Sequence, residues 1–125
     1  MCGVSKVIVI DDEPFILMMI EDKLKQAGLR VITMRESKNA LSLIKRERPD
    51  LVILDWMMPE LSGIELCAML KNDPDLSDIP VFLLTAKGQD TDKQMGLQCG
   101  ATLYITKPFS PRGLLEMVMK VIRGD

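Results

Sequence analysis

The sequence predicts an α/β fold, a doubly wound parallel sheet with helices on both faces. Five short apolar runs rich in β-branched residues alternate with segments whose apolar residues have helical spacing. Three of the runs consist almost entirely of Val, Ile, Leu or Phe, as is typical of strands covered on both faces. The 125 residues, 47% of them hydrophobic, suffice for one core without disulfides or metals. Such repeats form a parallel sheet with right-handed crossovers.

The five apolar runs are the expected strands. They are Lys6–Ile10, Arg30–Met34, Leu51–Leu54, Val81–Leu84 and Leu103–Thr106. The connections are short, with no linker or low-complexity stretch between them. Because the chain ends where the last helix is expected to end, we expect residues 1–125 to form one domain, with no second domain encoded.

The segments between and after the runs predict five helices. Gly28 ends the first, and Ser37 is a candidate N-cap for the second, which stops before Pro49. The apolar faces of the first three helices are Ile16, Ile20, Leu24 and Ala27; Ala40, Leu41 and Ile44; and Gly63, Leu66, Cys67 and Leu70.

The last two expected helices differ in the strength of their signals. The fourth, roughly Thr91 to Gln98, is the least regular and the least apolar of the five. Ser110 and Pro111 begin the fifth as N-cap and first helical residue. Its buried side is formed by Leu114, Leu115, Val118, Val121 and Ile122.

Composition excludes several classes of function. Sixteen Lys and Arg against 18 Asp and Glu give a net charge of −2, so no broad basic field could bind nucleic acid or an anionic membrane. The chain has no histidine, and its three cysteines lack CxxC spacing, which excludes a structural zinc site and a histidine-based triad. No apolar run reaches the ~20 residues of a membrane span, and no signal peptide is evident. We therefore expect a reduced, cytoplasmic location.

Polar residues directly follow four of the expected strands. They are Asp11, Asp12 and Glu13 after the first, Asp55 after the third, Thr85 after the fourth, and Lys107 and Pro108 after the fifth. Because the carboxyl ends of parallel strands share one edge, we expect these side chains to converge there. Two simpler interpretations stay open: the acidic triplet caps a helix, or Asp55 is a turn residue.

Carboxylates gathered at one edge need a compensating charge. Two of them ~4 Å apart repel by ~4 kcal/mol at an effective dielectric of 20, so either one is protonated or a cation lies among them. Oxygen ligands without His or Cys suit Mg²⁺, or alternatively Mn²⁺. Together with the ammonium of Lys107 and the hydroxyl of Thr85, a bound cation would complete a receptor for a phosphoryl group.

These motifs resemble the receiver domain of two-component response regulators over nearly the whole chain, about Ser5 to Arg123. No single motif is decisive, but four in this order and spacing are highly specific. The resemblance implies a flavodoxin-like five-stranded sheet in the order 2-1-3-4-5, with five helices. The motifs are Val-Ile-Val-Ile-Asp11-Asp12-Glu13-Pro14; Asp50-Leu-Val-Ile-Leu-Asp55-Trp-Met-Met-Pro59 with Ser62-Gly63; Pro80-Val-Phe-Leu-Leu-Thr85-Ala86; and Gly100-Ala101 through Tyr104-Ile-Thr-Lys107-Pro108-Phe109.

The resemblance also implies a role for each polar residue. Asp55 would accept a phosphoryl group from a phosphohistidine of a sensor histidine kinase or a phosphotransfer protein. Asp11 and Asp12, with Asp55 and the backbone carbonyl of Met57, would hold Mg²⁺. Lys107 would pair with the phosphoryl oxygens.

Further residues would switch the domain and set how long it stays phosphorylated. Thr85 would move toward the phosphoryl group and Tyr104 would rotate inward, although Tyr104 could simply be an amphipathic ring at the sheet edge. Met57 and Lys87 would tune hydrolysis by hindering the attacking water, which predicts a lifetime of minutes or longer. The peptide bond before Pro108 would be cis.

Other classes of function fit the residues less well. An aspartyl-phosphate phosphatase would need a second Asp where Met57 stands. A nucleotide-binding domain would need a glycine-rich loop after the first strand, and a flavodoxin would need a phosphate loop rich in Ser, Thr and Gly; the chain has Asp-Asp-Glu-Pro there. A receiver-like docking module that is never phosphorylated stays open as the alternative, although neither the acidic residues nor the lysine is missing.

We therefore expect a phosphorylated signalling domain rather than an enzyme. It would act on a downstream protein or on an attached output domain outside this chain, without binding nucleic acid or membranes itself. Phe15 and Met18 either dock the phosphoryl donor or are buried against the last helix. A symmetric dimer through the fourth helix, fifth strand and fifth helix is not expected, because Thr102, Leu103 and Gly113 stand where such dimers carry acidic residues.

Overall fold

The structure, a computed structural model, describes residues 5–58, 60–86 and 100–123. Within these ranges five strands and four helices follow one another along the chain. The fourth expected helix, Thr91 to Gln98, lies outside the described residues. The elements are β1 (Lys6–Ile10), α1 (Pro14–Gln26), β2 (Arg30–Met34), α2 (Ala40–Glu47), β3 (Leu51–Asp55), α3 (Gly63–Asn72), β4 (Val81–Ala86), β5 (Leu103–Lys107) and α5 (Pro111–Arg123).

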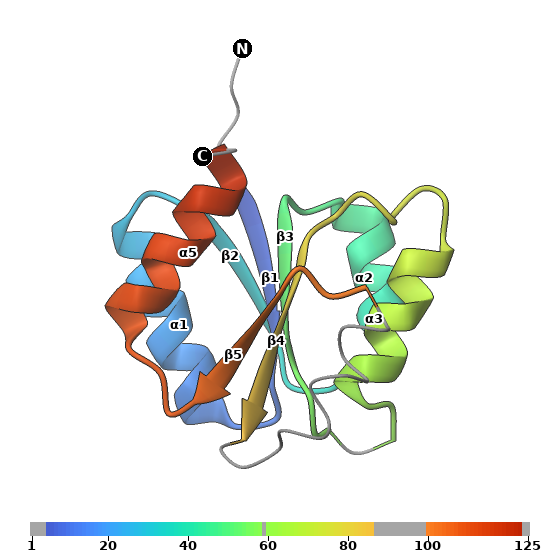
Figure 1. The fold of residues 1–125 in the computed structure, drawn as a ribbon, viewed down its shortest axis with the longest axis horizontal. Coiled ribbons are helices and arrows are strands. Elements are labelled where there is room, and N and C mark those ends of the chain that lie inside the picture. The colour runs from blue at the N-terminus through green and yellow to red at the C-terminus, as the bar shows by residue number, and fades with distance from the viewer. Residues whose placement is uncertain (1–4, 59, 87–99, 124–125) are drawn as a thin grey trace.

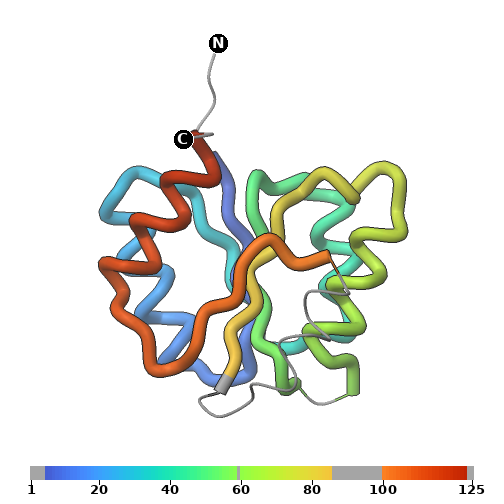
Figure 2. Tube along the Cα trace, in the orientation of Figure 1, coloured from blue at the N-terminus to red at the C-terminus, as the bar shows by residue number. Residues whose placement is uncertain are grey.

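All five strands form one parallel sheet in the order β2-β1-β3-β4-β5, which confirms the expected topology. Helices α1 and α5 cover one face of the sheet, and α2 and α3 cover the other (Figure 1). The path of the chain shows β4 lying between β3 and β5, so that residues far apart in sequence meet at the lower edge of the view (Figure 2). This edge holds the carboxyl ends of the strands.

Three strands end later than expected. The sequence suggested ends at residues 54, 84 and 106, whereas β3, β4 and β5 continue to Asp55, Ala86 and Lys107. The parallel register continues through these positions, pairing Asp55 with Leu84 and Ala86 with Lys107. A polar side chain does not prevent its backbone from pairing. Backbone pairing within the sheet therefore fixes the positions of Asp55, Thr85 and Lys107, and the loops begin only after them.

The core lies in two layers because strand side chains alternate between the faces. Ile8 and Ile10 of β1 pack into a cluster with α2 and α3, while Val7 and Val9 pack into a second cluster with α1 and α5. All four are fully buried. β1 and β3 are thus rigid central strands covered on both faces, and the positions at their carboxyl ends are well fixed. In the described part of the chain, no helix has the length and apolar character needed to cross a membrane.

The helix boundaries confirm most of the sequence signals and correct two of them. The N–H of Gly113 bonds to Oγ of Ser110 at 3.1 Å, which makes Ser110 the cap of α5 as expected. Ala27 is the C-cap of α1 and not its last helical residue. Ser37 is not the N-cap of α2: the helix begins at Ala40 with Asn39 as its cap, and the Ser37 hydroxyl donates to the backbone carbonyl of Leu61.

The start of α3 is fixed by a capping box and by a close backbone contact. Ser62 and Glu65 each accept a hydrogen bond from the other's backbone N–H. The N–H of Gly63 donates to the carbonyl of Trp56 at 2.9 Å. A Cβ at Gly63 would lie 2.2 Å from the backbone oxygen of Asp55, so only glycine fits here.

This contact predicts that Gly63→Ala is strongly destabilising. The added methyl would meet backbone that cannot move without shifting the end of β3, so we expect a loss of roughly 1–3 kcal/mol in the free energy of unfolding. Gly113→Ala on α5 is the matched control, because a Cβ there would meet atoms no closer than 3.6 Å. It should leave stability unchanged or raise it by up to about 1 kcal/mol. Urea unfolding measures both, and equal effects would contradict the prediction.

Candidate functional site

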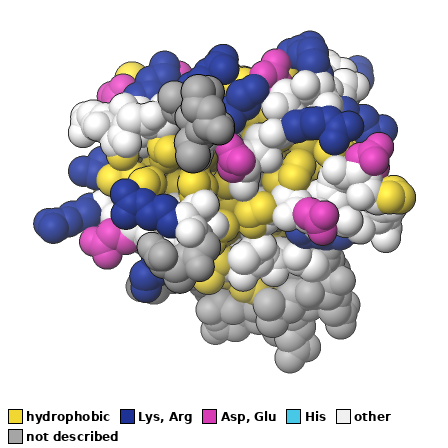
Figure 3. Space-filling view, turned by 90° about the horizontal axis from the view of Figure 1, so that it is seen from above, with side chains coloured by type: hydrophobic (Ala, Val, Ile, Leu, Met, Phe, Trp, Pro, Cys, Tyr) yellow, Lys and Arg dark blue, Asp and Glu magenta, His cyan; other side chains and the backbone are white. Residues whose placement is uncertain are grey.

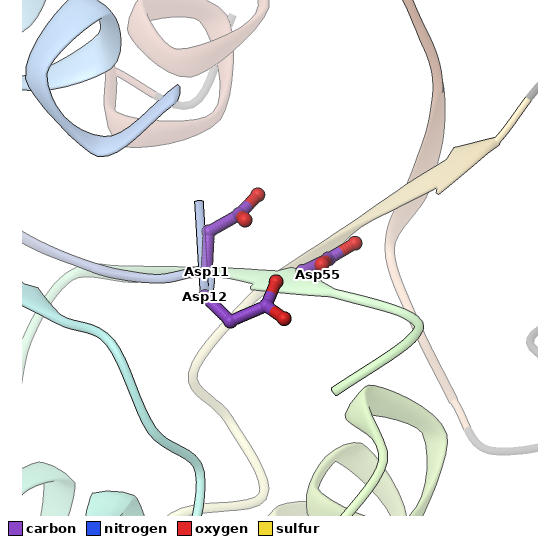
Figure 4. A group of neighbouring side chains, drawn as sticks. All are labelled: Asp11, Asp12 and Asp55. Atoms are coloured by element: carbon purple, nitrogen blue, oxygen red, sulfur yellow. The ribbon is translucent and has the colours of Figure 1, made fainter. Parts of the chain in front are cut away.

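Three carboxylates meet at the carboxyl edge of the sheet. Asp11 and Asp12 follow β1, and Asp55 is the last residue of the neighbouring strand β3 (Figure 4). One oxygen from each side chain lies within 4.8 Å of the others. The register pairs Ile10 with Leu54, which puts Asp11 and Asp55 at the same level of the sheet. The expected convergence of these three residues is confirmed.

Lys107 extends into this cluster from the end of β5. Its Nζ lies 3.0 Å from Oδ2 of Asp11, 3.2 Å from Oδ1 of Asp55 and 3.5 Å from Oε1 of Glu13. The N–H of Glu13 donates to Oδ1 of Asp11 at 2.9 Å. One ammonium thus faces three carboxylates, with Asp12 as a fourth acid nearby. The peptide bond between Lys107 and Pro108 is cis, as expected.

The two central carboxyl groups are buried. Asp11 has no exposed surface and Asp55 is only 6% exposed. Although Oδ2 of Asp11 lies near Nζ of Lys107, no residue in the described ranges bonds to it with hydrogen-bond geometry. This buried oxygen is paired with the Lys107 ammonium by charge alone, and such an incompletely satisfied carboxylate oxygen is a suitable ligand for a hard cation.

Burial and mutual repulsion also shift the acidity of the site. Burial, and next the charge of Asp11, raise the pKa of Asp55 to about 6, although Lys107 opposes the shift. Burial likewise raises the pKa of Asp11. Burial would lower the pKa of Lys107, but the neighbouring carboxylates Asp11 and Asp55 outweigh it and raise that pKa. Lys107 therefore stays charged at neutral pH, yet it cannot balance the carboxylates alone.

A small hollow opens beside the cluster. Its volume is about 230 Å³, and its lining consists of Asp12, Glu13, Asp55, Met57 and Lys107. The Met57 side chain is 62% exposed at its mouth. Asp11 lies behind it, fully buried. Asp55 and Lys107 thus line the hollow, whereas Asp11 contributes to the cluster from outside the lining.

The remaining expected site residues lie around this centre. Thr85 is buried near the end of β4, between the strands that carry Asp55 and Lys107. Tyr104 is half-buried on β5, and its ring stacks on Trp56 with centroids 6.1 Å apart and planes at 24°. Lys87 lies outside the described residues.

Sequence reasoning missed three features of the site. The stack between Trp56 and Tyr104 joins residues 48 positions apart, and no local pattern indicates it. The close backbone contact of Gly63 with Asp55 is not indicated by its place on the apolar face of the third expected helix, although Ser62 and Glu65 form the Ser-x-x-Glu pattern of a capped helix start. The proximity of Glu13 to Lys107 is also new, since Glu13 was interpreted only with the acidic triplet.

The opposite edge of the sheet has a different surface. Viewed from the amino ends of the strands, basic side chains are scattered around the rim with apolar side chains between them, and acidic side chains are interspersed (Figure 3). This mixed face shows no extended field of one sign. The cluster of Asp11, Asp12, Glu13, Asp55 and Lys107 lies at the carboxyl edge instead.

Comparisons with known proteins agree with this geometry. Residues 7–119 match the family model described as response regulator receiver domain. The phosphate regulon transcriptional regulatory protein PhoB of Pseudomonas aeruginosa is 44% identical over 117 residues, which is 94% of this chain and 51% of that protein. The alkaline phosphatase synthesis transcriptional regulatory protein PhoP of Bacillus subtilis is 41% identical over 119 residues, 95% of this chain and 49% of that protein. The chain thus spans about half the length of these relatives.

Solved structures agree over nearly the whole length of the chain. A putative response regulator from Chloroflexus aurantiacus superposes with a TM-score of 0.91 at 30% identity, covering 97% of this chain and 99% of that one. The signal receiver domain of a histidine kinase from Syntrophus aciditrophicus gives 0.90 at 34% identity, covering 97% and 92%. With its acidic cluster at the carboxyl edge of a 2-1-3-4-5 sheet, the chain belongs to the family of response regulator receiver domains, the phosphoacceptor modules of two-component signalling.

Proposed function

We propose that Asp55 is the phosphoacceptor, and that it receives its phosphoryl group from a phosphohistidine of a histidine kinase or phosphotransfer protein. The observation that carries this proposal is the position of Asp55, which lines the hollow, neighbours Asp11 and Asp12, and lies 3.2 Å from Nζ of Lys107. Asp11 is fully buried and does not line the hollow, so it suits a ligand role better than a nucleophilic one.

The chain's own residues supply most of the transfer chemistry. A carboxylate oxygen of Asp55 forms the new bond to phosphorus while the bond to the donor imidazole nitrogen breaks. Lys107 places its positive charge beside the phosphoryl oxygens, and Thr85 offers a hydroxyl donor. Asp11, Asp12, Asp55 and the backbone carbonyl of Met57 would hold Mg²⁺, which supplies further positive charge against the phosphoryl oxygens.

Two further roles belong to the same proposal. We attribute a long lifetime of the phosphorylated state to Met57 and Lys87. The apolar side chain of Met57, at the mouth of the hollow, offers no general base to an attacking water.

We propose that the phosphorylated domain controls a downstream protein or an attached output domain. The alternative, docking without phosphorylation, would not need an acidic cluster with a paired lysine beside an open hollow.

The phosphoacceptor assignment predicts a single covalent adduct. With acetyl phosphate and Mg²⁺, intact mass spectrometry should detect one phosphoryl group on the wild type and none on Asp55→Asn. Lys107→Ala should slow the reaction by ten- to about a hundredfold, because its charge no longer stabilises the transferred group. Lys45→Ala, which removes an exposed lysine paired with Asp73 on the other side of the molecule, is the control. An undiminished adduct on Asp55→Asn would refute the assignment.

The raised pKa of Asp55 predicts how stability depends on pH without divalent cations. The native state favours the protonated carboxyl group, so this favourable contribution is fully present below the ordinary pKa of 3.8 and is lost as pH rises through about 6. Asp55→Asn removes the cost of ionisation. It should therefore raise the free energy of unfolding by about 1–3 kcal/mol at pH 7.5 and by much less at pH 4.

With Mg²⁺ bound, the wild type should no longer be less stable than Asp55→Asn, because the cation offsets the repulsion between the carboxylates. Thermal unfolding at pH 7.5 should show a larger stabilisation by Mg²⁺ in the wild type than in Asp55→Asn. The affinity for Mg²⁺ should fall as pH drops through 6, since protons compete for the same oxygens. Equal stability of the two proteins at both pH values would contradict the electrostatic account.

Helix α1 carries the surface that we propose for the phosphoryl donor. Phe15 and Met18 are 69% and 55% exposed, so they are not buried against α5. Leu17 between them belongs to the core. These two exposed apolar side chains lie on the helix that begins directly after Glu13, a lining residue of the hollow, and they suit a hydrophobic contact with a donor protein.

Replacing Phe15 and Met18 by Ser and Gln should slow transfer from a phosphohistidine protein by about tenfold and leave acetyl phosphate reactivity unchanged. Met69→Gln is the matched control, because Met69 is an exposed methionine on α3, on the opposite face of the sheet. Stopped-flow Trp56 fluorescence follows both reactions. Slowing of equal size with the two donors would argue against a docking role.

A further inference from the structure

Ser37 is a buried polar residue whose hydrogen bond joins two loops. It is 1% exposed and lies between β2 and α2. Its hydroxyl donates to the backbone carbonyl of Leu61, 24 positions away in sequence. Because Asn39 is the N-cap of α2, the Ser37 side chain is not used at the start of its own helix.

Leu61 belongs to the loop of residues 56–62, which connects Asp55 to α3. The two ends of this loop are fixed: the N–H of Trp56 donates to Leu84 at 2.9 Å, and the N–H of Gly63 donates to the carbonyl of Trp56 at 2.9 Å. Within the described ranges, the bond from Ser37 is the only hydrogen bond that holds residues 57, 58, 60 or 61. The only hydrogen bond to these described loop residues thus comes from a side chain outside the loop, while Met58 and Leu61 also contact the core.

The same loop contains a residue in an unfavourable conformation. Glu60 has a φ of 70°, in the left-handed region that residues other than glycine rarely adopt. Such a conformation persists only where the surrounding structure imposes it. Met58 anchors one side of the strained residue in the core, and the bond from Ser37 to Leu61 restrains the other side. Ser37 therefore acts on the segment whose backbone would otherwise relax.

We propose that Ser37 is a positioning residue for the cation site. This inference rests on the proposed function, because the loop that it restrains carries the Met57 backbone carbonyl assigned there to Mg²⁺. With the loop held in one conformation before the cation arrives, binding does not have to order it, and affinity rises accordingly. Ser37 touches neither Asp55 nor the hollow, so it acts entirely through Leu61.

The experiment compares Ser37→Ala with Ser42→Ala, an exposed serine on α2 for which the described residues provide no hydrogen-bond partner. Amide hydrogen exchange in the metal-free proteins should be about three- to tenfold faster at residues 57, 58 and 60–62 in Ser37→Ala only. Mg²⁺ titration followed by Trp56 emission should show an affinity weaker by a similar factor. Ser37→Thr keeps the hydroxyl and should restore both values.

The outcomes separate this inference from the proposed function. Unchanged exchange in Ser37→Ala would overturn the inference, and so would faster exchange with unchanged Mg²⁺ affinity, even if the unfolding temperature fell. A wild-type protein that does not respond to Mg²⁺ would instead count against the proposed cation site. In that case the exchange data alone would decide whether Ser37 holds the loop.

Discussion

The structure of the site depends on the ammonium group of Lys107, which lies among the carboxylates that β1 and β3 bring together. β1 and β3 are adjacent and in register, so the carboxylates that follow them or end them cannot move apart without breaking the sheet. Lys107 relieves part of this repulsion from within 3.2 Å of both Asp11 and Asp55. The pKa of Asp55 is nevertheless raised, because burial and the remaining repulsion from Asp11 outweigh the effect of Lys107. A site with this residual repulsion gains stability from any cation that enters it.

The surrounding fold serves to keep that repulsive arrangement in place. β4 separates β3 from β5 and sets the distance over which Lys107 must extend. Gly63 allows the start of α3 to contact the backbone of Asp55 directly, which helps to fix the end of β3. The hydrogen bond from Ser37 to Leu61 restrains the loop that connects Asp55 to Gly63. The repulsion between the carboxylates destabilises the folded state, and the packing around them offsets this cost. Such an arrangement is common where a site is preorganised.

The apolar runs and the residues that follow them predicted the strands and the side chains that meet at the site, whereas the order of the strands was implied by the resemblance to receiver domains. Runs that are apolar on both faces are hard to accommodate except as central strands, and the shared edge of a parallel sheet then determines where Asp11, Asp55 and Lys107 meet. The ends of the strands were less predictable, because a polar side chain at the rim leaves backbone pairing intact. Ser37 illustrates a harder limit. Its local pattern fits an N-cap, and only the tertiary structure shows that the helix begins later and that the hydroxyl donates to a carbonyl 24 positions away.

The stack between Trp56 and Tyr104 bears on how the site could communicate with the edge of the sheet. Trp56 directly follows Asp55, so a displacement of the backbone there changes the contact with the Tyr104 ring on β5. An aromatic pair of this kind contributes about 0.5–1.5 kcal/mol beyond its buried area. That energy favours one ring position by roughly two- to thirteenfold, which leaves the other position populated. A phosphoryl group that binds one arrangement better by only a few kcal/mol would therefore be enough to reverse the preference.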